Sequence, residues 1–241
     1  MTVEERCAEI AANLADLRVR VERACETAGR DPGEITVIAI TKTFPASDIG
    51  LLAELGLTDV GENRDQEAAQ KHEQCSGLAL RWHFVGQLQR NKAKSVAHYA
   101  DVVHSVDRAE LIEALSRAAI GAGRTIGALV QVDLDPPAVG GAAGLARGGA
   151  APDGVGALAD AIAAAPGLEL GGVMAVAPLD TEPDEPFARL AVIAAELRTR
   201  HPGASMLSAG MTGDFESAIR HGATHLRIGS ALLGRRSAPV G

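Results

Sequence analysis

Residues 35–45 read ITVIAITKTFP, and the run of apolar and β-branched residues in this stretch decides the fold. Such a run, bounded by turn-forming residues, is typical of a buried strand in a parallel sheet. Seven further segments of this kind follow, with helical patterns between them. They lie at residues 58–61, 81–85, 101–105, 126–132, 170–175, 204–208 and 224–228.

Strands that alternate with helices form right-handed βαβ units and therefore a parallel sheet. Two of the intervening helices are marked by apolar residues at helical spacing, at 107–122 and 183–201. Eight strands with no long segment left over suit a closed (β/α)8 barrel better than an open sheet. The sequence therefore predicts the α/β class, with one TIM-type barrel domain spanning residues 1–241.

An extra N-terminal helix is predicted before the first strand. Its apolar residues recur at helical spacing, at Ile10, Leu14, Leu17, Val21 and Cys25. Thr2 and Glu5 have the T-x-x-E spacing of a capping box, which marks the helix start. Gly29, followed by Asp31 and Pro32, marks its end.

The composition excludes several classes of partner. Of the 241 residues, 46% are hydrophobic but only 2% are aromatic, which favours helices packed on a sheet over a β-sandwich. The net charge of −8 repels nucleic-acid backbones and anionic lipid, and few aromatic rings are present for base stacking. We therefore expect no nucleic-acid or membrane partner. A small anionic ligand stays compatible, because local cations and helix N-termini can bind it.

The cysteines and the N-terminus indicate a soluble, cytoplasmic protein. Cys7, Cys25 and Cys75 lack the CxxC or Cys/His spacing of a disulfide framework or a zinc site, and we expect no metal. The first ten residues are charged and helical in pattern, unlike a secretion signal. No apolar run is long enough to span a bilayer.

Candidate site residues follow from the rule that barrel sites form at the C-terminal ends of the strands. Lys42 ends the first strand, and alternation places it on the same side as Ile38 and Ile40. An amine in apolar surroundings is favoured in the neutral form that imine formation requires. The alternative is a lysine at the strand rim that forms a structural ion pair with Glu62.

The eighth strand adds a cation and an anion-binding turn. A closed barrel pairs strand eight with strand one, which brings Arg227 close to Lys42. Gly229 and Ser230 then open a short helix whose N–H groups and hydroxyl can bind phosphate, although an ordinary helix start is the alternative. An amine, a fixed cation and a phosphate site in one pocket match a cofactor that carries an aldehyde and a phosphate.

Seven segments resemble one known family. The chain is similar to the YggS/PROSC family of pyridoxal 5′-phosphate (PLP)-binding proteins, or PLP homeostasis proteins, whose fold type III barrel resembles the N-terminal domain of alanine racemase. The segments are ITVIAITKTFP (35–45), GENRDQEA (61–68), WHFVGQLQRNK (82–92), VHSVD (103–107), GGVMAVAP (171–178), LSAGMTGDFESAI (207–219) and THLRIGSALLG (224–234).

The resemblance implies a role for each matching residue. Lys42 would form the Schiff base with PLP, Arg227 would face the pyridine nitrogen and Asn63 would lie against the ring. The phosphate would be held by Ser208, Gly229 and Ser230, with backbone near Met211 and Thr212. This sequence departs from the family pattern at Val60, Ala209 and Thr212, which concerns the packing of the pocket.

The function implied is non-catalytic: a PLP-binding protein in vitamin B6 homeostasis that supplies PLP-dependent apo-enzymes. We expect a monomer, because a closed barrel has no edge strands to pair. A PLP-dependent amino-acid racemase is the alternative, but it needs a second acid/base. The only tyrosine, Tyr99, lies in a predicted helix far from any strand C-terminus. A barrel that binds another phosphorylated metabolite, with Lys42 as a simple cation, is a third hypothesis.

Two further features of the sequence are a histidine on the third strand and a glycine-rich segment. His83 on the third strand is expected to be a hydrogen-bonded structural residue rather than a catalyst. The glycine-rich segment GGAAGLARGGA at 140–150 is expected to be a mobile loop between barrel elements, and the sequence leaves open whether it covers the pocket.

Overall fold

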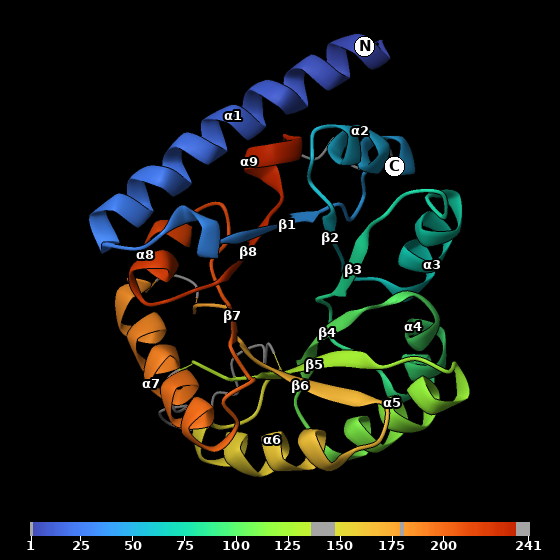
Figure 1. Ribbon diagram of the computed structural model, residues 1–241, viewed down its shortest axis with the longest axis vertical. Helices are drawn as coiled ribbons and strands as arrows, with labels where there is room; N and C mark the ends of the chain where they lie inside the picture. The colour runs from blue at the N-terminus through green and yellow to red at the C-terminus, as the bar shows by residue number, and fades with distance from the viewer. Residues whose placement is uncertain (1, 136–147, 179–180, 235–241) are drawn as a thin grey trace.

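Eight parallel strands close into a barrel within the part of the chain that the computed structural model describes, residues 2–135, 148–178 and 181–234 (Figure 1). Each strand pairs with the next, and β8 pairs back with β1. The strands are β1 Thr36–Ile40, β2 Asp59–Glu62, β3 Arg81–Phe84, β4 Val102–Val106, β5 Ile126–Gln131, β6 Leu168–Met174, β7 Met206–Ser208 and β8 His225–Ile228. All eight predicted strands are confirmed, with small shifts at their ends.

Helices form a ring outside the barrel (Figure 1). They are α2 Ala46–Glu54, α3 Asp65–Gln74, α4 Ala93–Tyr99, α5 Ala109–Gly121, α6 Val155–Ala164, α7 Asp184–Arg200, α8 Phe215–Arg220 and α9 Ser230–Leu233. Short 3-10 turns are η1 Pro32–Glu34, η2 Arg90–Lys92 and η4 Pro152–Gly154. The helices predicted at 107–122 and 183–201 are α5 and α7. None of the helices described in the chain has the length and apolar character to cross a membrane.

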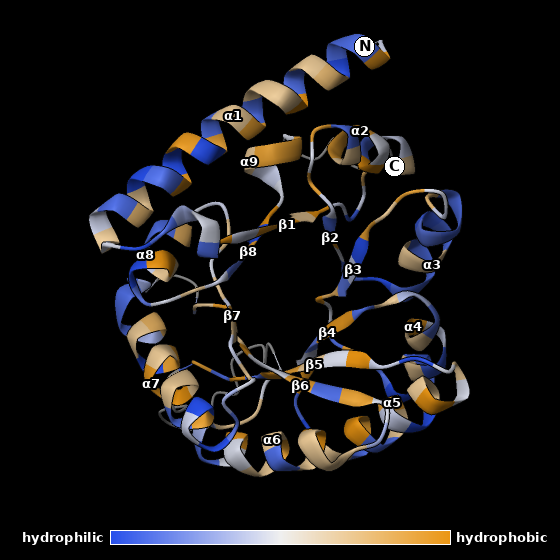
Figure 2. Ribbon diagram, in the orientation of Figure 1, coloured by the Kyte–Doolittle hydropathy of each residue, from blue (hydrophilic) through white to orange (hydrophobic). Residues whose placement is uncertain are grey.

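The hydrophobic core fills the layer between strands and helices. Hydrophobic and hydrophilic residues follow each other along the helices in Figure 2, as expected where one face of each helix packs on the sheet. The buried side chains are mostly small aliphatic ones, with Phe84, Phe187 and Phe215 as the largest fully buried aromatics. The sparse aromatic content therefore reflects a core that consists mainly of Ala, Val, Leu and Ile.

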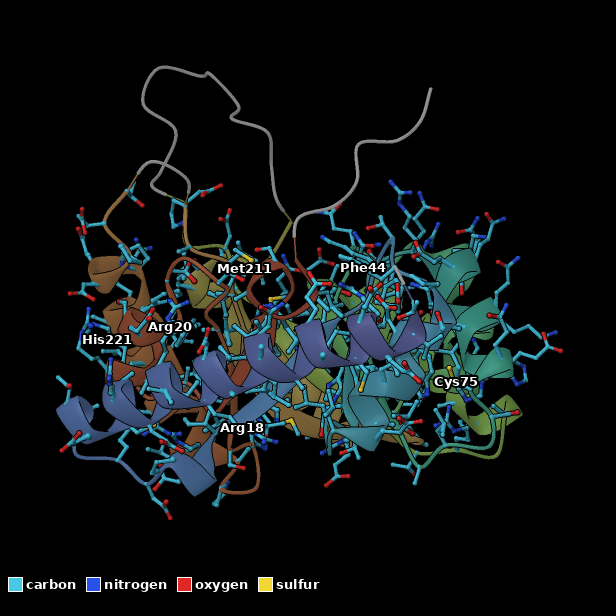
Figure 3. The ribbon with its side chains drawn as sticks, turned by 90° about the horizontal axis from the view of Figure 1, so that it is seen from above. Arg18, Arg20, Phe44, Cys75, Met211 and His221 are labelled. Carbon is cyan, nitrogen blue, oxygen red and sulfur yellow. The ribbon has the colours of Figure 1, made fainter. Side chains whose placement is uncertain are left out.

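The predicted extra helix is α1, Val3–Ala28, which runs along the outside of the barrel (Figure 3). The capping box is present, since Glu5 N–H donates to Thr2 Oγ1 and Thr2 N–H donates to Glu5 Oε2. Gly29 ends the helix with φ 65°, the left-handed conformation that suits glycine. The helix packs against α8 and α9, where the Arg20 guanidinium lies 4.5 Å from the centre of the Phe215 ring.

The glycine-rich segment predicted as a loop lies largely outside the described residues, which resume at Gly148. There the Gly148 carbonyl accepts a hydrogen bond from Gln131 Nε2, and Ala150 forms a parallel bridge with Val132. Cys25 and Cys75 are buried and Cys7 is half-buried, and all three are free thiols. Burial raises the pKa of the Cys25 and Cys75 thiols, as expected for packed rather than reactive cysteines.

Candidate functional site

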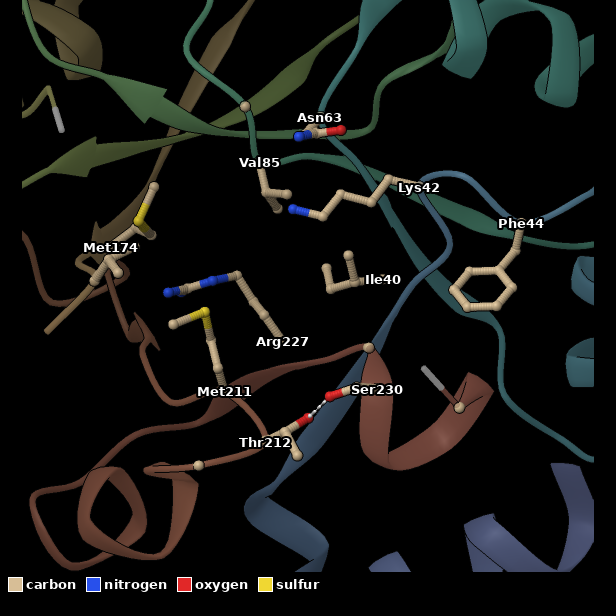
Figure 4. Close-up of a pocket in the computed structure, with 15 residues that line it drawn as sticks. Ile40, Lys42, Phe44, Asn63, Val85, Met174, Met211, Thr212, Arg227 and Ser230 are labelled. Carbon is tan, nitrogen blue, oxygen red and sulfur yellow. Dashed lines mark hydrogen bonds between the residues drawn. The ribbon is translucent and has the colours of Figure 1, made fainter. Parts of the chain in front are cut away.

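A cavity of about 360 Å³ lies at the C-terminal ends of the strands (Figure 4). It brings together five of the six predicted site residues: Lys42, Asn63, Arg227, Gly229 and Ser230. The remaining lining residues are mainly apolar or glycine. They are Ile40, Phe44, Val85, Gly86, Met174, Val176, Met211, Thr212, Gly213 and Gly234.

Lys42 was expected to end the first strand, but it lies two residues beyond the end of β1. The strand ends at Ile40, and the Phe44 N–H donates to the Thr41 carbonyl at 3.0 Å, which closes a turn with Lys42 and Thr43 at its centre. Strand alternation therefore does not set the direction of Lys42, contrary to the sequence argument. The turn nevertheless directs the half-buried side chain into the cavity beside Ile40 (Figure 4).

The buried carboxylate of Glu62 pairs with Lys71, a residue that the sequence argument did not consider. Glu62 Oε1 accepts hydrogen bonds from Lys71 Nζ and from Thr41 Oγ1, both at 2.7 Å. Burial raises the pKa of Glu62, against the opposing effect of these two donors. The structural ion pair suggested for Lys42 and Glu62 is thus formed by Lys71. A signal was available, because Glu67 and Lys71 have the i,i+4 spacing of a helical ion pair.

Arg227 on β8 is a buried cation in the cavity wall. Its Nη1 donates to the carbonyl and to the hydroxyl of Ser208, both at 2.8 Å, and its Nη2 donates to the Ala175 carbonyl at 2.7 Å. Burial lowers the pKa of Arg227 to about 10, so the guanidinium stays charged at neutral pH. Three hydrogen bonds to the barrel fix its position before any ligand binds.

Ser208 is the predicted site residue that the structure places elsewhere. Its side chain is fully buried behind Arg227 and does not line the cavity. The hydroxyl is already engaged by Arg227 and by His104 Nδ1, the latter at 3.0 Å. The expected direct contact of Ser208 with a phosphate stays a prediction; in the structure the residue supports Arg227 from the barrel interior.

A hydrogen-bonded chain continues from Ser208 through the barrel. His104 Nε2 lies 2.9 Å from His83 Nδ1, and His83 Nε2 lies 2.9 Å from Asp59 Oδ1. His83 is thus hydrogen-bonded through both ring nitrogens, as the sequence indicated. The chain runs from Asp59, at the start of β2, to the guanidinium of Arg227.

The protonation states of Asp59, His83 and His104 determine which atom donates in each of these hydrogen bonds. Burial lowers the pKa of His83 and of His104, so both imidazoles are neutral at pH 7. Burial raises the pKa of Asp59, but the hydrogen bond from His83 and the nearby positive charges together outweigh it, and the net shift is downward. An ionised carboxylate only accepts, so each histidine must carry its proton on Nε2 and the Ser208 hydroxyl must donate to His104. The Ser208 oxygen is then left to accept from Arg227.

The turns after β7 and β8 meet at the opposite side of the cavity. The Arg227 N–H donates to the Gly210 carbonyl at 2.9 Å, and both Ser230 Oγ and the Ala231 N–H lie 3.3 Å from Thr212 Oγ1. Gly229 and Ser230 stand at the start of the single-turn helix α9 (Figure 4). Hydroxyl groups and glycine backbone from two neighbouring turns are a suitable surface for a phosphate group.

Asn63 forms part of the wall between Lys42 and β3. Its Oδ1 atom is buried and has no hydrogen-bond partner among the described residues, a state that costs free energy unless a ligand satisfies it. Gly86 lies against its backbone, because a Cβ at Gly86 would be 2.2 Å from the Asn63 carbonyl oxygen. The wall is therefore preformed, and it offers an unsatisfied amide to a polar ligand.

An apolar wall that the sequence did not indicate is formed by Phe44, Val85, Met174, Val176 and Met211, of which only the backbone near Met211 was expected at the site. Met174 and Val176 alternate at the end of β6, so strand periodicity could have indicated them. An apolar wall opposite polar groups suits a flat ring with polar substituents. No group of three or more His, Cys, Asp or Glu side chains within the described ranges is arranged to hold a metal ion.

Comparison with known proteins places the chain in a family. Residues 12–237 match the model of the alanine racemase N-terminal domain. The chain is 41% identical over 251 residues to the pyridoxal phosphate homeostasis protein of Mycobacterium tuberculosis, covering 96% of this chain and 95% of that protein. It is 37% identical to the protein of the same name from Pseudomonas aeruginosa, with 94% and 96% covered.

A solved structure agrees with this placement. The structure of PipY from Synechococcus elongatus, with PLP bound, superimposes with a TM-score of 0.79 and 33% sequence identity, covering 93% of this chain and all of that one. The barrel, the strand-end cavity and the near full-length similarity lead to one assignment. The chain belongs to the pyridoxal phosphate homeostasis protein family, whose barrel is that of the alanine racemase N-terminal domain.

Proposed function

We propose that this protein binds PLP as a Schiff base on Lys42 and holds it for intracellular PLP homeostasis or delivery, without catalysing a reaction of its own. The observation that carries the proposal is the presence of Lys42 and the buried Arg227 on one cavity. The unsatisfied Asn63 amide and the hydroxyl groups of the β7 and β8 turns fit the remaining groups of the cofactor. When bound, PLP supplies an aldehyde carbon and an electron-withdrawing pyridine ring.

Each residue has a distinct task in this proposal. Lys42 would form the imine with the aldehyde carbon, with loss of the carbonyl oxygen as water, and Asn63 would form a hydrogen bond with a substituent on the ring. Arg227 donates a hydrogen bond to the pyridine nitrogen, supported from behind by Ser208. Gly229, Ser230 and Thr212 bind the phosphate, and the apolar wall excludes water from the imine.

The composition of the cavity supports a non-enzymatic role. Arg227 disfavours a protonated pyridine ring and so weakens the electron sink that most PLP chemistry requires. Among the described residues that line the cavity, Lys42 and Arg227 are the ionisable ones. The Tyr99 hydroxyl donates to Asp65 Oδ1 at 3.5 Å and lies outside the lining, and burial raises its pKa. A racemase would need a second acid/base on the cavity.

The proposal is tested by absorbance of the wild-type protein and of Lys42→Ala, each mixed with PLP and then treated with borohydride. We expect a visible imine band that reduction traps in the wild type, and none in Lys42→Ala. The exposed Lys94 supplies the control, since Lys94→Ala should retain the band.

A wild-type protein without an imine band at excess PLP would contradict the proposal. Lys42 would then be a simple cation in a barrel for another phosphorylated ligand. Formation of D-alanine from L-alanine by the loaded protein would select the racemase instead.

We further infer that the protein acts in the cytoplasm as one domain spanning residues 1–241, as a monomer that supplies PLP-dependent apo-enzymes. The pairing of β8 with β1 closes the sheet of the described residues, so this sheet has no open edge for pairing with a second copy. Light scattering on the loaded protein measures the mass directly. Incubation with an apo-enzyme, followed by assay of that enzyme, measures transfer.

A further inference from the structure

The turn that carries Lys42 contains a backbone conformation that its residue type disfavours. Thr43, directly after Lys42, has φ 71° and is the one non-glycine residue with positive φ within the described ranges. A positive φ is unfavourable for a β-branched residue and persists only where surrounding contacts enforce it. The direction of Lys42 thus depends on whatever holds this turn.

Lys71 on α3 is the group that holds it. This lysine is buried, with 6% of its surface exposed. Its ammonium group donates to the Thr41 carbonyl at 2.8 Å, to Glu62 Oε1 at 2.7 Å and to Glu67 Oε1 at 2.6 Å. An ammonium group has three N–H donors, so these contacts use all of them.

Both carboxylates that bind Lys71 also bind the turn. Glu62 Oε1 accepts from the Thr41 hydroxyl at 2.7 Å, and Glu67 Oε1 accepts from the Thr43 backbone N–H at 2.5 Å. The residues immediately before and after Lys42 are thereby tied to one buried cation. The Thr43 N–H is fixed in the orientation that positive φ requires.

This arrangement contributes little to the free energy of unfolding, which points to a role in the site. A buried ion pair contributes little net stability, because removing both charges from water offsets their attraction. Glu62 Oε2 is in addition buried without a hydrogen-bond partner among the described residues. An apolar contact between α3 and the turn would be enough to pack the two together. It would not orient the Thr41 carbonyl and the Thr43 N–H, as the hydrogen bonds of this cluster do.

We propose that Lys71, acting with Glu62 and Glu67, is a positioning residue that holds the strained turn so that the Lys42 amine faces the cofactor aldehyde. The inference rests on the proposed function, because it concerns the same covalent site. It predicts that loss of Lys71 impairs formation of the covalent bond while the cavity itself still binds a phosphorylated pyridine.

The test separates covalent from non-covalent binding in Lys71→Met. Imine formation is followed by absorbance after mixing with PLP, and non-covalent affinity is measured with pyridoxine 5′-phosphate, which lacks the aldehyde. We expect imine formation to slow by roughly tenfold to a hundredfold, as for other displaced reacting groups. The Kd for pyridoxine 5′-phosphate should stay close to that of the wild type.

Three further variants control for unfolding and for loss of charge. Thr43→Gly removes the conformational strain, because glycine adopts positive φ readily. The double variant Lys71→Met with Thr43→Gly should therefore recover most of the rate of imine formation. Glu67→Ala removes the acceptor of the Thr43 N–H from a partly exposed position and should also slow imine formation. Lys92→Met removes a half-exposed lysine that pairs with Asp65 and should have no effect. Urea unfolding checks that each variant is folded.

The outcomes are distinct. A wild-type rate in folded Lys71→Met would overturn the inference and leave the proposed function intact. An equal loss of imine formation and of pyridoxine 5′-phosphate binding would also overturn it, since Lys71 would then support the whole cavity. Absence of an imine in the wild type would defeat the proposed function itself.

Discussion

At the scale of single residues, Ser208 and Ser230 show how two serines at neighbouring strand ends take different tasks. Ser208 is fully buried between Arg227 and His104, whereas Ser230 lines the cavity. A sequence motif places both serines at the C-terminal face of the barrel. It does not say which hydroxyl points into the barrel interior and which lines the cavity. That direction depends on the guanidinium of Arg227, which comes from a different strand and occupies the Ser208 hydroxyl.

Alanine at each serine should separate these tasks. Ser208→Ala leaves His104 Nδ1 and one donor of Arg227 without a partner, so we expect the free energy of unfolding to fall by about 1–3 kcal/mol. Ser230→Ala should leave the free energy of unfolding within about 0.5 kcal/mol and weaken binding of pyridoxine 5′-phosphate. Urea denaturation and ligand titration of both variants measure this. The interpretation is wrong if Ser208→Ala is fully stable and loses the ligand.

The sequence was informative about which residues meet at the cavity and less informative about what each one contacts. Lys42 and Arg227 were expected together because strand ends converge in a barrel, the family resemblance added Asn63, and all three line one cavity. Only Lys42 was considered as the partner of Glu62, whereas the structure pairs Glu62 with Lys71. The choice depends on the turn of the chain after Ile40, which brings the Thr41 carbonyl to Lys71.

At the scale of elements, the ends of β2 and β3 are locked together at Gly86. A Cβ on this residue would lie 2.2 Å from the Asn63 carbonyl oxygen and 2.9 Å from its Cα. A side chain at this position would therefore push against the backbone that carries Asn63. The periodic strand pattern predicted both strands, but it could not reveal that their following loops touch, because contact between loops leaves no periodic signal.

Gly86→Ala should therefore both destabilise the protein and displace Asn63. We expect the free energy of unfolding to fall by at least about 2 kcal/mol, as for overpacking at a rigid site. Gly50→Ala in α2 is the matched control, since a Cβ there meets nothing within 4 Å. A helical glycine replaced by alanine should stabilise by roughly 0.5–1 kcal/mol. Similar unfolding curves for the two variants would refute the close approach.

At the scale of the whole molecule, the barrel interior encloses three histidines that stay neutral. Burial lowers the pKa of His83 and His104, and burial together with His83 and Arg81 lowers the pKa of His225 to about 4. In the unfolded chain these residues titrate near pH 6.5. Below that pH the unfolded state binds more protons than the folded state, so acidification favours unfolding.

The free energy of unfolding should thus fall as the pH drops from 6.5 towards 4. His225→Gln should flatten this decline by up to about 1.4 kcal/mol per pH unit, because one such histidine is removed. His98→Gln, at an exposed position on α4, should follow the wild type. Urea denaturation at several pH values measures the slopes. Parallel curves for wild type and His225→Gln would show that His225 is not held neutral.

The pairing of β8 with β1 joins the beginning of the barrel to its end, from Thr36 beside His225 to Ala39 beside Ile228. During synthesis Lys42 emerges from the ribosome early, and Arg227 emerges close to the end of the barrel sequence. The two walls of the cavity therefore meet only after the barrel sequence from β1 to β8 has emerged. Nascent or prematurely terminated chains lack the complete cavity, so ligand capture has to wait until the last strand has been synthesised and has docked.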